Sequence, residues 1–222
     1  MEIKAVIFDY DGTLVHLNID FQEMRQRIDT LLDSFGLSAS PLRGLLTLET
    51  IDKATELLSQ RDSRAGRAFH RTALKLVTDI EVEAAKEGKV LPGVIGALRA
   101  LRNHDIKVGI ITRNCEEAVR IAFPHIEELC DAFVPRDNVT HVKPHPGHLQ
   151  SAMKKMNIKD VKQCLMVGDH PIDVEAGRRI GMRTAGVLTG HATGQQFMDA
   201  GADLVLQDAT EVLDHIDKEK KW

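Results

Sequence analysis

The sequence predicts an α/β protein in which a parallel sheet is covered by helices and interrupted by a small helical insertion. Three observations support this prediction. Short apolar runs recur along the chain, helical patterns separate most of them, and residues 16–88 break the alternation. Strands that alternate with helices are joined by crossovers, which produce a parallel sheet with helices on both faces. We therefore expect a Rossmann-like, doubly wound core with an inserted α-helical domain.

The predicted strands are short runs rich in Val, Ile, Leu and Phe. They are nearly continuous hydrophobic segments rather than alternating ones, which is typical of strands buried on both faces. We expect strands at residues 3–8, 107–111, 131–134, 164–167, 183–188 and 203–206.

The segments between these strands have the apolar spacing of amphipathic helices. Two of them have clear start signals. Asn114 can cap a first turn that carries Glu116 and Glu117, and Pro171 suits the first position of a helix. We expect helices at residues 94–104, 114–123, 147–156, 171–181, 193–200 and 208–217.

The insertion follows the first strand directly and is largely helical by pattern. Residues 15–18 and 87–89 resemble connectors at its two ends. We therefore predict two domains, an α/β core formed by residues 1–15 and 89–222 and a small helical domain formed by residues 16–88.

Composition limits the partners of the protein. The formal net charge of −4 argues against a general nucleic-acid binder, and an aromatic content of 4% is too low for a surface that stacks bases. No apolar run approaches the length of a membrane span, and no signal-peptide pattern precedes the first strand. Cys115, Cys130 and Cys164 are too scattered for a disulfide framework or a zinc site. We expect a cytoplasmic protein that binds neither nucleic acid nor membrane.

Two carboxylates follow the first predicted strand, in the run Asp9-Tyr10-Asp11-Gly12-Thr13. Ligands of open parallel sheets bind at the carboxyl ends of the strands. Residues two apart in an extended chain project to the same side, so Asp9 and Asp11 can reach one substrate. One carboxylate can then attack phosphorus while the other donates and accepts protons, which is covalent catalysis with a general acid and base.

This run resembles the first motif of the haloacid dehalogenase superfamily, and the later motifs of that superfamily have counterparts along the chain. Thr112 ends the predicted strand at 107–111, and Lys143 precedes the strand at 164–167 in the run Lys143-Pro144-His145-Pro146. The run Gly168-Asp169-His170-Pro171-Ile172-Asp173 follows that strand. Two positions depart from the usual pattern: Arg113 stands where Asn is frequent, and His170 where many relatives have Ser.

The resemblance implies a magnesium-dependent hydrolase that acts on phosphoric monoesters. In such an enzyme Asp9 is the nucleophile and forms an aspartyl-phosphate. Asp11 protonates the leaving alcohol and later deprotonates the attacking water. These roles make the first motif the chemical centre of the predicted site.

The remaining motif residues are expected to hold the substrate and the metal. Thr112 and Lys143 would hold the transferred phosphoryl group, and Arg113 would contribute to substrate binding. Mg²⁺ prefers oxygen ligands, and the implied ligands are the acidic residues of the first and last motifs. They are Asp9, Asp11 through its main-chain carbonyl, Asp169 and Asp173, the last as a support of the metal shell.

The helical insertion after the first motif resembles phosphoglycolate-phosphatase-like members and implies a small phosphorylated metabolite as substrate. A phosphosugar mutase similar to beta-phosphoglucomutase uses the same motifs and a similar insertion, and is the main alternative. A dehalogenase is less favoured because it has no leaving alcohol for Asp11 to protonate. A non-catalytic binding module is the last alternative, and loss of a motif acid would have favoured it.

Two other clusters have simpler interpretations. We interpret the three histidines of one loop as solvated side chains rather than metal ligands. They are His141, His145 and His148. Four arginines at roughly helical spacing in the insertion could form a basic wall toward an anionic substrate, but a solvated helix face is the favoured interpretation. They are Arg61, Arg64, Arg67 and Arg71.

Overall fold

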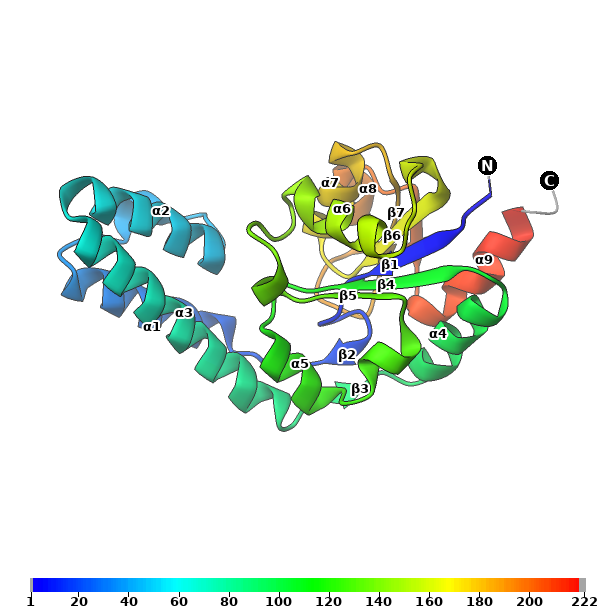
Figure 1. The fold of residues 1–222 in the computed structure, drawn as a ribbon, viewed down its shortest axis with the longest axis horizontal. Coiled ribbons are helices and arrows are strands. Elements are labelled where there is room, and N and C mark those ends of the chain that lie inside the picture. Colours follow the sequence, from blue (N-terminus) through cyan, green and yellow to red (C-terminus); the bar gives the residue numbers. More distant parts are fainter. Residues whose placement is uncertain (1, 220–222) are drawn as a thin grey trace. The chain divides into compact units, whose positions relative to one another are not determined.

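The computed structural model of the protein describes residues 2–219. Its main feature is a six-stranded parallel sheet with the strand order β5-β4-β1-β6-β7-β8 (Figure 1). The strands are β1 (Ala5–Phe8), β4 (Lys107–Ile111), β5 (Ala132–Val134), β6 (Cys164–Gly168), β7 (Arg183–Val187) and β8 (Leu204–Leu206). Phe8 of the central strand lies opposite Ile110 of β4 and Val167 of β6. The predicted fold class is confirmed, and each predicted strand coincides with an observed one apart from small differences at the ends.

Helices cover both faces of this sheet (Figure 1). α6 (Pro146–Lys155), α7 (Pro171–Arg179) and α8 (Gly194–Ala200) lie on one face. The opposite face carries α4 (Val94–Asn103), α5 (Glu116–Ala122) and α9 (Val212–Glu219). Pro171 occupies the first turn of α7, as predicted. The last helix starts later than residue 208, because a 3-10 turn (Ala209–Glu211) precedes it.

The start of α5 corrects one prediction. Asn114 does not cap this helix; the N-cap is Cys115, which makes no side-chain capping bond. The carboxylate of Asp137 takes over part of that task, because its Oδ2 accepts a hydrogen bond of 2.7 Å from the main-chain nitrogen of Glu116. A long-range contact thus replaces the local cap that the sequence indicated.

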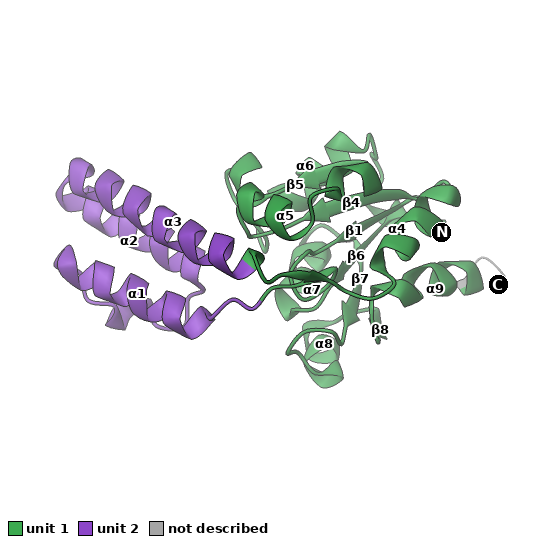
Figure 2. Cartoon of the chain, turned by 90° about the horizontal axis from the view of Figure 1, so that it is seen from below, with its two compact units in different colours: residues 1–17, 85–222 green, residues 18–84 purple. Residues whose placement is uncertain are grey.

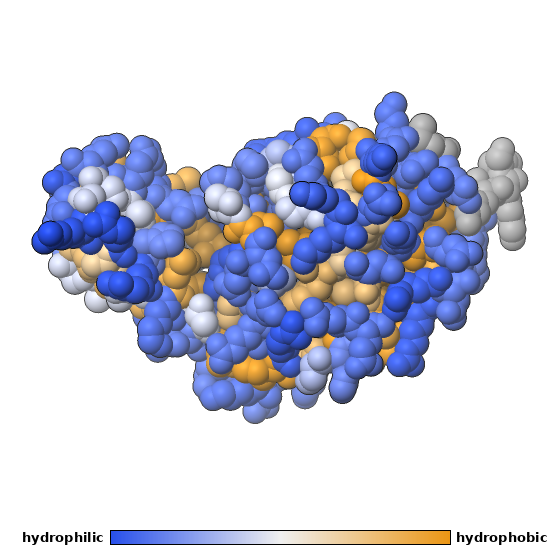
Figure 3. All heavy atoms as spheres, in the orientation of Figure 1, coloured by the Kyte–Doolittle hydropathy of each residue, from blue (hydrophilic) through white to orange (hydrophobic). Residues whose placement is uncertain are grey.

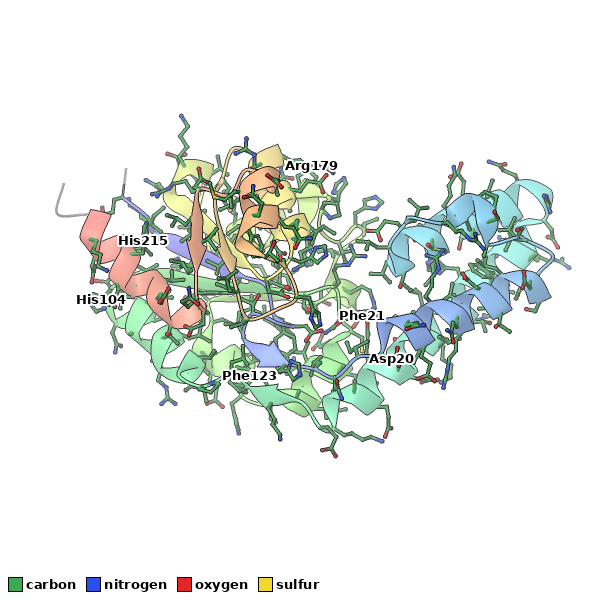
Figure 4. The ribbon with its side chains drawn as sticks, turned by 180° about the vertical axis from the view of Figure 1, so that it is seen from behind. Asp20, Phe21, His104, Phe123, Arg179 and His215 are labelled. Atoms are coloured by element: carbon green, nitrogen blue, oxygen red, sulfur yellow. The ribbon has the colours of Figure 1, made fainter. Side chains whose placement is uncertain are left out.

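The chain divides into two compact units, residues 1–17 with 85–222 and residues 18–84 (Figure 2). The second unit consists of α1 (Phe21–Ser34), α2 (Thr47–Arg61) and most of α3 (Ser63–Ala85). Asp20, labelled in Figure 4, caps α1 through a 2.7 Å hydrogen bond from the nitrogen of Glu23. The unit buries a core of its own, which includes Met24, Ile28, Leu32, Ile51, Leu58, Phe69 and Val77.

The predicted connectors contain a short piece of regular structure. β2 (Val15–His16) and β3 (Lys89–Val90) pair as an antiparallel ribbon, with Val15 opposite Val90. A ribbon of this length is below what periodicity can reveal. It pairs the segments that precede and follow the helical insertion, and both of its strands belong to the first unit.

The surface agrees with the charged composition of the chain. The face in Figure 3 is largely hydrophilic, with limited hydrophobic patches. Arg61, Arg64, Arg67 and Arg71 are all exposed, as predicted. They do not share one helix face, because Arg61 is the last residue of α2 and the other three belong to α3. Among residues 2–219, no helix is long and apolar enough to cross a membrane.

Candidate active site

The first motif forms a tight turn at the carboxyl end of β1. The nitrogen of Asp9 donates to the carbonyl of Val167 at 2.8 Å, which continues the pairing of β1 with β6. Tyr10 is fully buried, and its hydroxyl donates to the carbonyl of Val119 at 3.3 Å. Gly12 then adopts a positive φ of 78°, which residues with a side chain rarely do. The turn leaves the side chains of Asp9 and Asp11 at the end of the central strand.

Lys143 is the positive centre of the site. Its side chain is buried, and its Nζ forms ion pairs with Asp9 Oδ1 and, at 2.6 Å, with Asp173 Oδ1. Burial alone would lower the pKa of Lys143, but the carboxylates of Asp173 and Asp9 raise this pKa above its ordinary value. The lysine is therefore charged, and it holds Asp9 in a fixed position.

Three carboxylates gather around this lysine. Asp9, Asp169 and Asp173 each offer an oxygen, and these oxygens lie within 4.8 Å of one another. Burial, together with the negative charges of Asp9 and Asp173, raises the pKa of Asp169 to about 9. Burial also raises the pKa of Asp173 to about 6, although Lys143 opposes this rise. The cluster thus has more negative charge than one lysine neutralises.

This donor set fits a divalent cation such as Mg²⁺. Hard cations prefer carboxylate and carbonyl oxygens, and the cluster lies at the sheet edge where ligands bind. Burial first, and then the charges of Asp9 and Asp173, raise the pKa of Asp169, and a bound cation would oppose both effects by stabilising the ionised carboxylate. The acidic cluster could therefore hold a divalent cation.

Two glycines and a threonine fix the position of Asp169. A Cβ on Gly12 or Gly190 would lie 2.2 Å or 2.0 Å from Asp169 Oδ2, so neither position has room for a side chain. The hydroxyl of Thr13 donates to Asp169 Oδ1 at 3.2 Å. Asp169 is therefore packed against two backbone segments and oriented by a hydrogen bond.

Asp173 connects helix α7 to the lysine. Its Oδ1 accepts from Lys143, and its Oδ2 accepts from the nitrogen of His170 at 3.2 Å. The His170 ring in turn accepts from the nitrogen of Ile172 at 3.1 Å, which completes a capping box. Arg179, at the end of the same helix (Figure 4), donates to the carbonyl of Pro144 at 3.3 Å. Helix α7 and the lysine loop are thus joined at both ends of the helix.

The other two predicted substrate-binding residues follow β4. Thr112 is buried, and its Oγ1 accepts from the nitrogen of Asn114 at 3.1 Å. Arg113 donates through Nη1 to the carbonyl of Lys143 at 2.6 Å. Arg113 therefore contacts the lysine loop directly and helps to hold it, and Thr112 is the buried residue that precedes Arg113 in the chain.

Asp11 lies slightly apart from the acidic cluster. It is half-buried, and its Oδ1 accepts from the nitrogen of Leu17 at 3.0 Å. Its carboxylate is therefore not one of the three clustered oxygens. The side chain of Asp11 is therefore separate from the three oxygens that could share one cation.

Sequence reasoning missed several members of the site. Thr13 was part of the first motif but had no predicted role. Gly190 gave no signal, because it belongs to a loop after β7 that only the fold brings under Asp169. His148 was predicted to be solvated, and this was wrong: it is fully buried. Its position on the same helix face as Ala152, which is also buried, could have indicated this.

Comparisons with known proteins agree with this geometry. A family model for haloacid dehalogenase-like hydrolases matches residues 6–187. The chain is 30% identical over 202 residues to pyrophosphatase PpaX of Bacillus cereus (strain G9842), a match that covers 84% of each chain.

Two solved structures have a similar fold. One is a predicted phosphoglycolate phosphatase from Haemophilus somnus, with a TM-score of 0.64, 18% identity, and coverage of 97% of this chain and 98% of that one. The other is a proposed beta-phosphoglucomutase from Thermotoga maritima, with a TM-score of 0.59, 23% identity, and coverage of 98% and 99%. At these identities the likeness is one of fold.

Proposed function

This chain belongs to the haloacid dehalogenase-like hydrolases, and we propose that it is a magnesium-dependent phosphatase acting on a small phosphomonoester through an aspartyl-phosphate. One observation carries the proposal. Asp9 is held by the buried Lys143 next to the carboxylates of Asp169 and Asp173. This arrangement supplies a fixed nucleophile, a positive charge for the phosphoryl group and oxygen ligands for a cation.

The proposed reaction has two steps. An oxygen of Asp9 bonds to phosphorus as the bond from phosphorus to the leaving oxygen breaks, and Asp11 gives that oxygen its proton. Asp11 then removes a proton from water as the water oxygen attacks phosphorus, which releases phosphate and restores Asp9. Lys143 and the hydroxyl of Thr112 hold the oxygens of the transferred group.

The proposed metal site uses the acidic cluster. Asp9, Asp169 and the Asp11 carbonyl would hold Mg²⁺, with Asp173 in support. When bound, the ion supplies positive charge that neutralises phosphate oxygens and orients them for in-line attack.

A panel of phosphomonoesters assayed with and without Mg²⁺ tests this proposal. Wild-type protein is expected to release phosphate only with the metal, and Asp9→Asn to release none because the amide cannot form the aspartyl-phosphate. Near-normal turnover by Asp9→Asn, or turnover that does not change when Mg²⁺ is chelated, would contradict the proposed function.

Pyrophosphate is a second candidate substrate, favoured by the 30% identity with pyrophosphatase PpaX. Its leaving group is inorganic phosphate, a much weaker base than the alkoxide that leaves from an alkyl phosphate, so its departure depends less on the proton that Asp11 donates. Asp11→Asn is therefore expected to slow hydrolysis of an alkyl phosphate more than hydrolysis of pyrophosphate. Comparing wild-type kcat/KM for the two substrates identifies the preferred class.

A phosphosugar mutase remains the main alternative activity. It would return the phosphoryl group to a sugar instead of water. Incubation with sugar phosphates, with free phosphate and isomerised sugar followed in parallel, separates the two activities.

The helical unit, residues 18–84, is proposed to be a cap domain that selects a small phosphorylated metabolite. Its separate core supports this role, because a unit with its own core can move as a body. The three cysteines are free and buried, which suits a reducing compartment, and we propose the cytoplasm. Neither nucleic acid nor membrane is a proposed partner.

A further inference from the structure

The imidazole of His148 connects the lysine loop to the end of a core strand. This side chain is fully buried in the first turns of α6. Its Nδ1 accepts a hydrogen bond of 3.1 Å from the main-chain nitrogen of Lys143. Its Nε2 lies 2.9 Å from the carbonyl of Val134, the last residue of β5. Because a main-chain N–H only donates and a carbonyl only accepts, the ring must be the neutral tautomer with its proton on Nε2.

The carbonyl of Val134 has a second donor, which extends the connection to Thr112. The main-chain nitrogen of Thr112 donates to the same oxygen at 3.3 Å. Lys143 and Thr112 are thus linked through one imidazole and one carbonyl. Arg113 holds the other side of the lysine by donating to its carbonyl at 2.6 Å.

We propose that His148 is a positioning residue that sets the main chain of Lys143 relative to Thr112, and so aligns the two groups that hold the phosphoryl group. This inference rests on the proposed phosphatase function. His148 takes no part in the chemistry of Lys143 or Thr112. It sets the distance between these two groups, and small displacements of groups that hold the substrate have large effects on the rate.

The ring is suited to this task only while it is neutral. The charged groups that face it are Lys143 of its own loop, Arg113 after β4 and Asp9 after β1. Two of these three are cations, and the ring is buried, so a second proton on the ring is disfavoured. A proton on Nδ1 would face the main-chain N–H of Lys143, so the hydrogen bond between Lys143 and His148 would be lost.

Three variants test the proposal on the full-length protein. His148→Leu removes both hydrogen bonds, whereas His148→Gln can still accept from Lys143 and donate to Val134. His141→Gln is the matched control, because His141 is an exposed histidine of the same loop. Two quantities are measured: kcat and KM for the best phosphomonoester, and the hydrogen-exchange rate of the Lys143 amide, which does not depend on turnover.

The proposal expects His148→Leu to lower kcat by about tenfold or more, with a smaller change in KM, and to speed exchange at the Lys143 amide. His148→Gln and His141→Gln are expected to stay close to wild type in both measurements. Unchanged kcat and exchange in His148→Leu would overturn the proposal. If the wild type hydrolyses no phosphomonoester, the phosphatase function fails, and exchange at Lys143 still decides whether His148 positions that residue.

If His148→Leu does not fold, the pH profile decides. Wild-type kcat is expected to fall as the pH approaches about 4, where His148 gains its second proton. His148→Gln cannot titrate and is expected to lack that part of the acid limb. Identical acid limbs in the two proteins would overturn the proposal.

Discussion

At the scale of single residues, the site depends on one buried cation. Lys143 neutralises part of a cluster of carboxylates that are themselves removed from water. A buried ion pair contributes little net stability when it is intact, but removing one partner leaves an uncompensated buried charge. The lysine is therefore a structural requirement as well as a proposed catalytic group.

The first prediction concerns this charge. Lys143→Met is expected to lower the free energy of unfolding by about 3 kcal/mol or more in metal-free buffer, because Asp9 and Asp173 lose their shared partner. Urea denaturation measures the change. Adding Asp173→Asn should restore part of the lost free energy of unfolding, because it removes one of the two buried carboxylates left without a positive partner. A double variant no more stable than the single one would contradict this explanation.

The second prediction concerns His148 and pH. Burial, with Lys143 and Arg113 nearby, lowers its pKa to about 4 from an ordinary value of 6.5. The unfolded chain therefore binds more protons than the folded protein between these pH values, and folding stability from the neutral ring is lost as the pH falls from 6.5 toward 4. The full loss is about 3 kcal/mol, from about 1.4 kcal/mol for each pKa unit.

The comparison with His148→Gln isolates this effect. The raised pKa values of Asp173 and Asp169 have the opposite effect on folding stability over the same pH range. The pH dependence of wild-type stability is therefore a sum of these effects and that of His148. Urea denaturation of both proteins at several pH values gives their difference. The stability advantage of the wild type over His148→Gln should shrink steadily below pH 6.5, and a constant difference would show that the histidine titrates normally.

At the level of secondary structure, the candidate site is formed by residues that follow the carboxyl ends of neighbouring strands. The turn after β1, the residue after β4 and the turn after β6 carry Asp9, Thr112 and Asp169, and the parallel sheet places these ends side by side. The sequence predicted this juxtaposition because each motif follows an apolar run, and runs buried on both faces are easy to recognise. The acidic cluster was predicted from the resemblance of these motifs to those of the haloacid dehalogenase superfamily, together with the burial of the strands that precede them.

Contacts between segments far apart in the sequence were not predictable in the same way. Gly190 lies against Asp169, and Asp137 caps α5, through tertiary structure alone. The two-residue strands β2 and β3 are too short for any periodicity. The prediction for His148 was wrong because it rested on the polar residue type and not on the position of His148 on the buried face of α6. Two hydrogen bonds satisfy the ring in this buried position.

The third prediction tests the packing of the loop after β7. Gly190→Ala would place a Cβ 2.0 Å from Asp169 Oδ2 and 2.8 Å from Asp169 Cβ, so the carboxylate must move. We expect the affinity for Mg²⁺ to fall by about tenfold or more, as when the surroundings of a metal ligand change. Calorimetric titration with Mg²⁺ measures the affinity.

Gly96→Ala is the control for this variant. Gly96 lies inside α4, where an added Cβ meets no atom within 4 Å. Alanine there should leave the affinity for Mg²⁺ unchanged and raise the free energy of unfolding by about 0.5–1 kcal/mol, because glycine loses more conformational freedom in a helix. Normal metal binding in Gly190→Ala would show that the loop yields and that Asp169 keeps its place.

At the scale of the whole molecule, the two compact units divide the proposed tasks. All residues of the candidate site belong to residues 1–17 and 85–222, and the helical unit keeps a separate apolar core. A ligand that binds only the folded form of one unit stabilises that unit by mass action. The two units can therefore unfold in separate transitions, in place of a single two-state transition of the whole chain.

The fourth prediction follows from this division. Saturating Mg²⁺ at about a hundred times its dissociation constant should stabilise the unit that binds it by about 2.7 kcal/mol. Hydrogen exchange followed by mass spectrometry should then show slower exchange in β1, β6 and the start of α7, while α1 and α2 change little. Asp169→Asn should abolish the effect, because it removes a charged ligand and leaves the helical core intact. Equal protection of both units by Mg²⁺ would mean that they unfold together, and that their separate cores do not give them separate stabilities.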